Sequence, residues 1–155
     1  MTTTKIGLTI AGLLGCLLFC APAHAQAANT FTVQASGTVT TPAEAVAFSG
    51  PIQIASTIVT DAAGGPPTSV VNIDARQLSA VGATTATAFV NSGQASLTRP
   101  LVASDVIQTT ISFFPSGPGG FLKPRTAVLN LTLTYDLVTG ALTAATASIA
   151  TPTFK

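Results

Sequence analysis

Alternation of apolar and polar residues is the main pattern along most of this chain. The clearest case is the segment 126–137, where every second residue from Ala127 to Leu137 is apolar or aromatic and most of the intervening residues are polar. A period of two places successive side chains on opposite faces of a β-strand. The pattern therefore predicts a strand over residues 126–137 with one face buried in a core.

Shorter segments show the same alternation and are separated by residues that favour turns. Gly-Pro clusters interrupt the pattern at 61–67 and 115–120, and Gly140 is expected in the left-handed conformation of a hairpin turn. Strands with turn signals about every ten residues predict an all-β fold. We expect a single antiparallel β-sandwich or partly closed barrel of about eight short strands, and the pattern leaves both architectures open. The alternating segments are 31–35, 52–58, 71–74, 89–90 and 107–113.

The first 25 residues have the organisation of a secretory signal peptide. Lys5 precedes an apolar run from Ile6 to Phe19, and small residues at Ala23 and Ala25 suit signal peptidase. The run is shorter than the roughly 20 residues that a membrane-spanning helix needs. We expect a signal helix over 1–25 that is removed, and a single all-β domain over 26–155 in which 26–41 is a candidate extended N-terminal strand.

A second cleavage position is also open. The segment Leu13-Leu14-Gly15-Cys16 resembles a lipobox, the short motif before the lipid-modified cysteine of bacterial lipoproteins. Cleavage before Cys16 would leave a lipid-anchored protein, whereas cleavage after Ala25 would leave a protein exported to the periplasm or the extracellular space. The apolar residues directly after Cys16 favour cleavage after Ala25.

Cleavage after Ala25 would remove most of the reactive side chains. Both cysteines, the only histidine and the only methionine lie before Gln26, and the chain has no tryptophan. Nucleophilic mechanisms based on Ser-His or Cys-His pairs are then excluded. The remaining acidic residues are scattered, which disfavours a metal site or a paired-carboxylate mechanism. We therefore expect neither enzymatic activity nor a cofactor.

The charge balance limits the classes of molecule that this chain is expected to bind. Removing 25 of the 155 residues leaves 130, with five basic and five acidic side chains. A chain with so little charge and no basic patch is not expected to bind nucleic acid, and no transmembrane span is expected after cleavage. We expect an exported protein with a structural or association role, whose partner is another copy or another envelope protein. The alternative is a carrier of a small apolar ligand.

Two groups of residues are candidate interaction sites. The side chains of Asp74 and Arg76 share a strand face, and Arg99 and Asp105 flank a short loop, so we expect two structural ion pairs. An apolar interaction patch is a further candidate; the alternative is a strand buried on both faces and covered by the loop. Its residues are Phe113, Phe114, Phe121 and Leu122.

Overall fold

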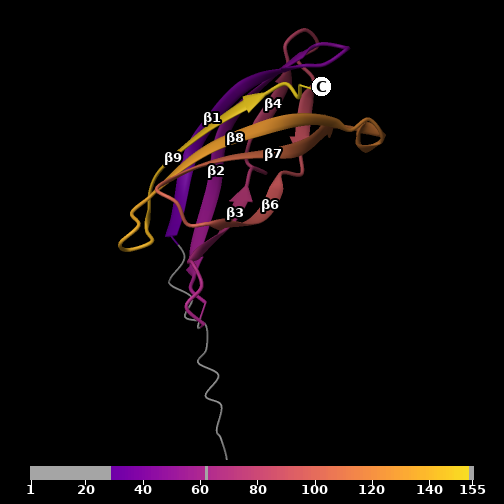
Figure 1. The fold of residues 1–155 in the computed structure, drawn as a ribbon. Coiled ribbons are helices and arrows are strands. Elements are labelled where there is room, and N and C mark those ends of the chain that lie inside the picture. The colour runs from indigo at the N-terminus through magenta and orange to yellow at the C-terminus, as the bar shows by residue number, and fades with distance from the viewer. Residues whose placement is uncertain (1–28, 62, 154–155) are drawn as a thin grey trace, which may run out of the picture.

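The computed structural model describes residues 29–61 and 63–153, and these form nine strands in one mixed sheet with a single 3₁₀ turn (Figure 1). No α-helix occurs in this part of the chain, so the all-β prediction is confirmed. The signal segment 1–25, Cys16 and both cleavage-site alanines lie outside the described residues. The elements are β1 (Asn29–Thr40), β2 (Ala45–Val59), β3 (Thr68–Asp74), β4 (Ser79–Gly82), β5 (Ala88–Asn91), β6 (Gln94–Pro100), β7 (Ser104–Pro115), η1 (Gly120–Leu122), β8 (Arg125–Tyr135) and β9 (Leu142–Ala150).

The strand order is β1-β9-β8-β7-β5-β4-β2-β3-β6, and β1 also pairs with β2. All pairings are antiparallel except that of β1 with β9, which is parallel. The expectation of a purely antiparallel sheet is therefore wrong at this junction. Parallel pairing needs a long connection between the two strands, and here almost the whole described chain lies between them.

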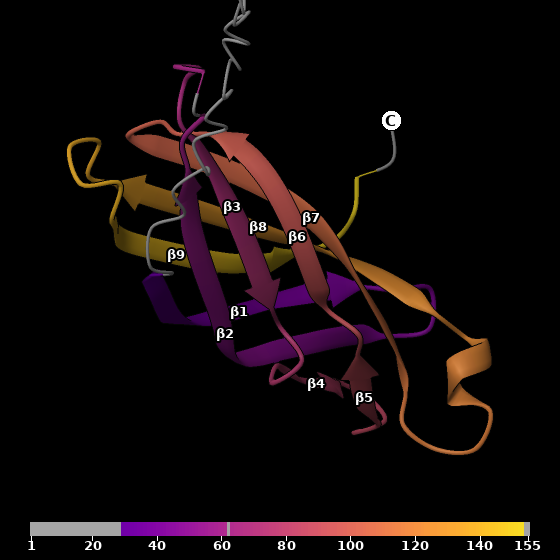
Figure 2. The same ribbon diagram turned by 90° about the horizontal axis from the view of Figure 1, so that it is seen from below.

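The sheet is curled rather than flat, so strands from its two halves face each other across the core (Figure 2). Tyr135 at the end of β8 shows this contact, because its hydroxyl lies 3.3 Å from that of Ser56 in β2 and 3.1 Å from that of Ser69 in β3. All three side chains are buried. This hydrogen-bonded cluster therefore joins the β2–β3 side of the sheet to β8.

The alternating residues face the core as the pattern predicts. Ile52, Ile54 and Ile58 of β2 are buried, as is every second residue of β8 from Ala127 to Tyr135. Leu137 departs from the prediction and is 55% exposed. The strand ends at Tyr135 because Asp136 begins a tight turn, in which the N–H of Gly140 donates to the Asp136 carbonyl. Gly140 has φ 70°, the left-handed conformation expected for it.

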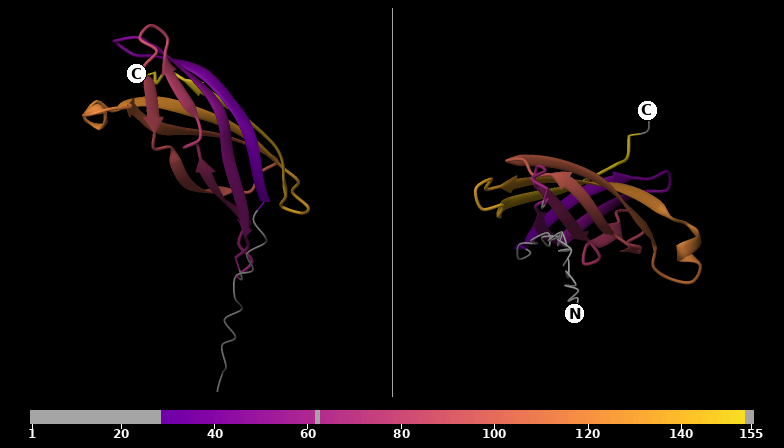
Figure 3. Two further views of the ribbon diagram at one scale, coloured as in Figure 1. Left: turned by 180° about the vertical axis from the view of Figure 1, so that it is seen from behind. Right: turned by 60° about the horizontal axis from the view of Figure 1, so that its bottom comes forward.

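The close approach of β1 to β9 depends on a glycine. The two strands lie side by side in Figures 1 and 3, and their register joins Ala35 to Ala147 and Gly37 to Ile149. A β-carbon at Gly37 would overlap the backbone carbonyl of Ile149. The absence of a side chain at this position therefore allows the N-terminal and C-terminal strands to meet.

Candidate functional site

The structure separates the four residues of the candidate apolar patch. Phe113 is fully buried, and its ring packs edge to face against Phe48 with centroids 5.0 Å apart. Phe114 is half-buried on the opposite face of β7. Phe121 and Leu122 are 68% and 72% exposed, on η1 in the orange loop that projects from the sheet (Figure 1). Only this last pair forms an exposed apolar surface.

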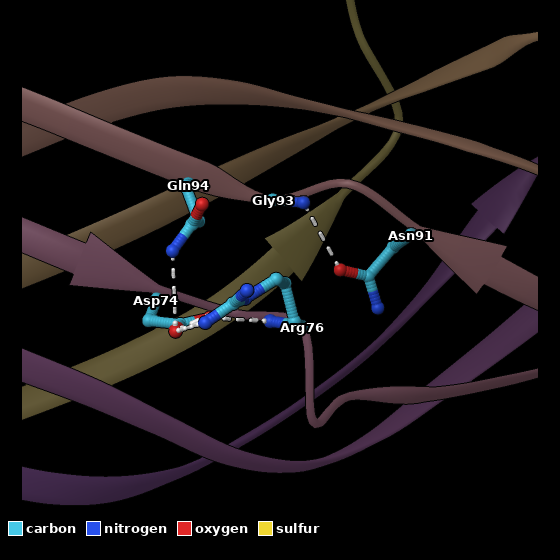
Figure 4. A network of polar contacts seen from close by, with 5 residues as sticks. All are labelled: Asp74, Arg76, Asn91, Gly93 and Gln94. Carbon is cyan, nitrogen blue, oxygen red and sulfur yellow. Dashed lines mark hydrogen bonds and ion pairs between the residues drawn. The ribbon is translucent and has the colours of Figure 1, made fainter.

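Asp74 and Arg76 form an ion pair where β3 ends. The Arg76 guanidinium donates to both carboxylate oxygens of Asp74, with the shortest distance 2.6 Å, and Gln94 of β6 donates to the same carboxylate at 3.4 Å (Figure 4). These hydrogen bonds, chiefly the one from the Arg76 side chain, lower the pKa of Asp74 to about 2. Both partners contact solvent, so the pair is a surface clamp between β3 and the turn that follows.

This ion pair borders a hollow in the surface with a volume of about 510 Å³. The hollow is lined mainly by amide and hydroxyl side chains from neighbouring strands, and its one carboxylate is held by Arg76. It offers hydrogen bonds but no nucleophile paired with a base. The lining residues are Thr30, Gln53, Ala55, Asn72, Ile73, Asp74, Gln94, Ala95 and Ser96.

Asn91 fixes the passage from β5 to β6. Its buried side chain donates to the Leu78 carbonyl at 2.9 Å. It also accepts the Gly93 N–H at 3.2 Å (Figure 4). The N–H of Ser92 next to it donates to the Ser112 carbonyl of β7 at 3.0 Å. The chain therefore stays bound to β7 until residue 92 and only then turns away toward β3.

Beyond that point β6 and β7 do not pair, although they follow each other in the sequence. At their other end, an ion pair links Arg99 of β6 to Asp105 of β7, with donor–acceptor distances of 2.8 and 3.0 Å. The Asp105 side chain is 9% exposed and that of Arg99 is 43% exposed. The hydrogen bonds from Arg99 lower the pKa of Asp105, although burial opposes this shift. We call residues 94–100 and 104–111 the β6–β7 junction.

Strand β7 has an unpaired edge at this junction. The Tyr135 N–H donates to the Ala103 carbonyl, so the backbone groups of residue 103 face β8. Along an antiparallel ladder the backbone N–H and C=O groups of successive residues point alternately to one neighbour and to the other. The backbone groups of Val106, Gln108 and Thr110 therefore face away from β8. Ser112 follows the same alternation, because its carbonyl accepts from the Ser92 N–H on the side away from β8. Within 29–61 and 63–153, no strand pairs with this stretch on that side.

Strand β6 has a corresponding edge. Its odd-numbered residues face β3, because the Leu101 N–H donates to the Pro67 carbonyl and the Gly93 carbonyl accepts from Ala75. The backbone groups of Ser96 and Thr98 consequently face away from β3. The side chains that β6 turns toward the core include Ala95 and Leu97, which are only partly buried. The junction thus combines two unpaired edges with incompletely covered apolar side chains.

Sequence reasoning found both ion pairs but missed the junction and the buried hydroxyl cluster. A signal for the cluster was present, since Ser56 occupies an apolar-face position between Ile54 and Ile58. A buried hydroxyl needs a partner, which predicts a second polar group facing it. The sequence contains no comparable signal for the junction, because an unpaired edge is defined by the strands that are not beside it.

Comparison with protein-family models, with curated proteins and with solved structures finds no match to this chain. Among the described residues, no helix is long and apolar enough to span a membrane. The same residues contain no group of three or more side chains of the kinds that hold a metal ion.

Proposed function

We propose that this chain is an exported, non-enzymatic β protein with a structural or association role at the cell envelope or outside the cell. The observation that carries the proposal is the β6–β7 junction, where two strands expose unpaired backbone groups. An unpaired edge is a template for pairing with another polypeptide, and monomeric proteins usually protect it with charge or proline. On β7, the residues Val106, Gln108 and Thr110 that face outward are neither.

The strand pairings support a more specific architecture, a partly closed barrel. They run from β2 through β1, β9, β8, β7, β5 and β4 and return to β2. Strands β3 and β6 continue from the other half of β2, and this half of the wall is the one that stays unpaired at β7. The interruption of the barrel and the candidate association site would then be the same feature.

The residues before the sheet support export. A basic residue, the apolar run Ile6–Phe19 and the small residues Ala23 and Ala25 form a signal peptide pattern. Mass spectrometry of the chain after expression with its leader tests this proposal. We expect a mature protein that begins at Gln26; a diacylated N-terminal Cys16 would replace the exported domain by a lipoprotein.

The alternation in the N-terminal strand would also suit a strand that is donated to a neighbouring subunit, but its pairing does not favour this use. In the structure β1 pairs with β2 at twelve residue positions and contributes Ala35 and Val39 to the core. Donation of residues 26–41 would therefore require β1 to leave its own sheet. Association through the β6–β7 junction requires no such loss.

The alternative, a carrier of a small apolar ligand, has weaker support. Phe48, Phe89 and Phe113 pack edge to face within the core, and the hollow beside Asp74 is lined by amide and hydroxyl side chains as well as apolar ones. Native mass spectrometry of the gently purified protein tests it, since a retained lipid-sized mass would favour the carrier.

Chemical cross-linking in the producing cells, followed by sedimentation of the extracted mature protein, tests the association role. We expect the protein in a complex with itself or with another envelope protein. A monomer in both measurements, at every concentration used, would contradict the proposal.

A further inference from the structure

We propose that the β6–β7 junction accepts one extended polypeptide segment as an additional strand, and that this segment is uncharged, with apolar residues alternating with polar ones. This inference rests on the proposed association role and specifies its partner. The strand would lie between Gln94–Pro100 and Ser104–Ile111, and would pair with both edges of the junction.

The first argument is the direction of the free backbone groups. The N–H and C=O groups of Ser96 and Thr98 face away from β3 along the edge of β6, and those of Gln108 and Thr110 face away from β8 along the edge of β7. A strand between two others pairs with both neighbours. The junction supplies the two hydrogen-bonding edges that one inserted strand needs.

The second argument is how the junction is bounded. At one end the Ser92 N–H binds the Ser112 carbonyl, and at the other Arg99 binds Asp105 through two hydrogen bonds. Between these points the structure joins β6 and β7 by no pairing, although a three-residue connection would suit a hairpin. Strands that follow one another usually pair, so this unpaired arrangement is unusual.

The third argument fixes the chemistry of the segment. Toward the core, the junction presents the half-buried Ala95, Leu97 and Thr109 together with buried Ile107, so side chains that the inserted strand turns inward should be apolar. Toward solvent, its neighbours would be uncharged polar residues such as Ser96, Gln108 and Thr110. Arg99 and Asp105 neutralise each other, so a charge on the segment would have no partner.

The length of the segment follows from the free edges. The unpaired part of β7 spans 104–111 and β6 spans 94–100, which at about 3.3 Å per residue is on the order of 25 Å. Pro100 removes one donor at the end of β6, and the Gln94 N–H already binds the Ser92 carbonyl. The segment should therefore pair over about five residues.

Hydrogen exchange, measured residue by residue by NMR on the mature protein, tests whether the outward-facing amides of the β6–β7 junction are unpaired. In the unbound protein we expect fast exchange at Ser96, Thr98, Gln108 and Thr110, and protection at Ile107 and Thr109, whose N–H groups face β8. Protection of the first four amides in a monomer would show that the junction is closed and would overturn the inference.

The binding test uses a synthetic peptide with the sequence of residues 30–36, which has the required alternation, as a probe. We expect it to protect the outward-facing amides of both β6 and β7. A control peptide with lysine in place of both Phe31 and Val33 should bind at least about tenfold more weakly. Protection on one strand only, or no protection at saturating peptide, would overturn the inference.

Two matched substitutions separate backbone pairing from side-chain effects. Thr110→Pro removes an N–H that faces away from β8, so it breaks no bond of the β7–β8 ladder. Thr110→Val keeps that N–H and changes only the side chain. We expect the proline variant to lose at least about tenfold in peptide affinity and the valine variant to bind like the wild type. Equal affinity of the two variants would contradict strand insertion.

If Thr110→Pro fails to fold, as judged by circular dichroism, Thr98→Pro and Thr98→Val on β6 make the same comparison from the other edge. If the wild-type protein associates in cells and every proline variant that folds associates equally, this inference is overturned and the proposed function stands. A wild-type protein that associates with nothing would overturn the proposed function itself.

Discussion

Two junctions in this sheet bring together strands of very different separation along the chain, with opposite results. At the β1–β9 junction, strands from the two ends of the described chain pair directly, although over only three residue positions. At the β6–β7 junction, strands that follow one another in the sequence do not pair, and an ion pair between Arg99 and Asp105 links them near the connecting loop. Proximity in sequence does not decide which strands join.

The two junctions differ in which groups join their strands. At β1–β9, Gly37 has no side chain, so the two backbones come into contact. At β6–β7, no backbone pairing joins the two strands, and the ion pair between Arg99 and Asp105 links them through side chains. Direct closure satisfies backbone groups, whereas closure by side chains leaves them available to a partner.

The substitution with the largest expected effect is Gly37→Ala, which disrupts the β1–β9 junction. The new β-carbon would overlap the Ile149 backbone, and backbone cannot move away as a flexible side chain can. Overpacking of this kind costs about 3 kcal/mol at the upper end of its usual range. Urea unfolding monitored by circular dichroism measures the loss.

Ser36→Ala is the matched control, because Ser36 lies next to Gly37 and is exposed. Replacing glycine by alanine in an unstrained strand stabilises a protein by restricting the unfolded chain. A Gly37→Ala protein as stable as the Ser36→Ala protein would therefore show that β1 and β9 do not approach as closely as described.

Asp105→Asn tests the ion pair at the β6–β7 junction and should have an intermediate effect on the free energy of unfolding. It keeps the shape of the side chain but removes the charge that Arg99 faces. Because Asp105 is buried while Arg99 reaches water, we expect a loss of about 1–2 kcal/mol, less than for a fully buried pair. Thermal unfolding near neutral pH measures it.

Asp74→Asn provides the comparison for that loss. It breaks an ion pair of similar geometry, but both partners contact solvent, and exposed pairs contribute about 0.5 kcal/mol or less. If the two variants are equally destabilised, burial at the β6–β7 junction is not what gives the Arg99–Asp105 pair its strength.

Local pattern predicted the strands well and their closure poorly, for a physical reason. The alternation at Ile52, Ile54 and Ile58 reports which face of one strand is buried, and this depends on a few neighbouring residues. The role of Gly37 depends on Ile149, more than a hundred residues away, and nothing near Gly37 indicates it. The ion pairs were predictable because Asp74 and Arg76, and likewise Arg99 and Asp105, are close in the sequence.

The smallest expected effect is a salt-dependent difference between the two aspartates. The folded pKa of each is below its ordinary value, so each ionised carboxylate stabilises the fold above about pH 4, and this contribution is lost as the pH falls through the folded pKa. For Asp74 that loss extends down to about pH 2.

At about 1 M salt the electrostatic screening length falls to about 3 Å, and this screening acts mainly on exposed charges. Carboxyl ¹³C titrations at low and high salt should therefore show the pKa of Asp74 rising more than that of Asp105. Asp136 is the control, since hydrogen bonds from backbone N–H groups and from the Thr139 hydroxyl, rather than a cation, lower its pKa. An equal response of Asp74 and Asp105 would mean that water reaches the β6–β7 junction as freely as the protein surface.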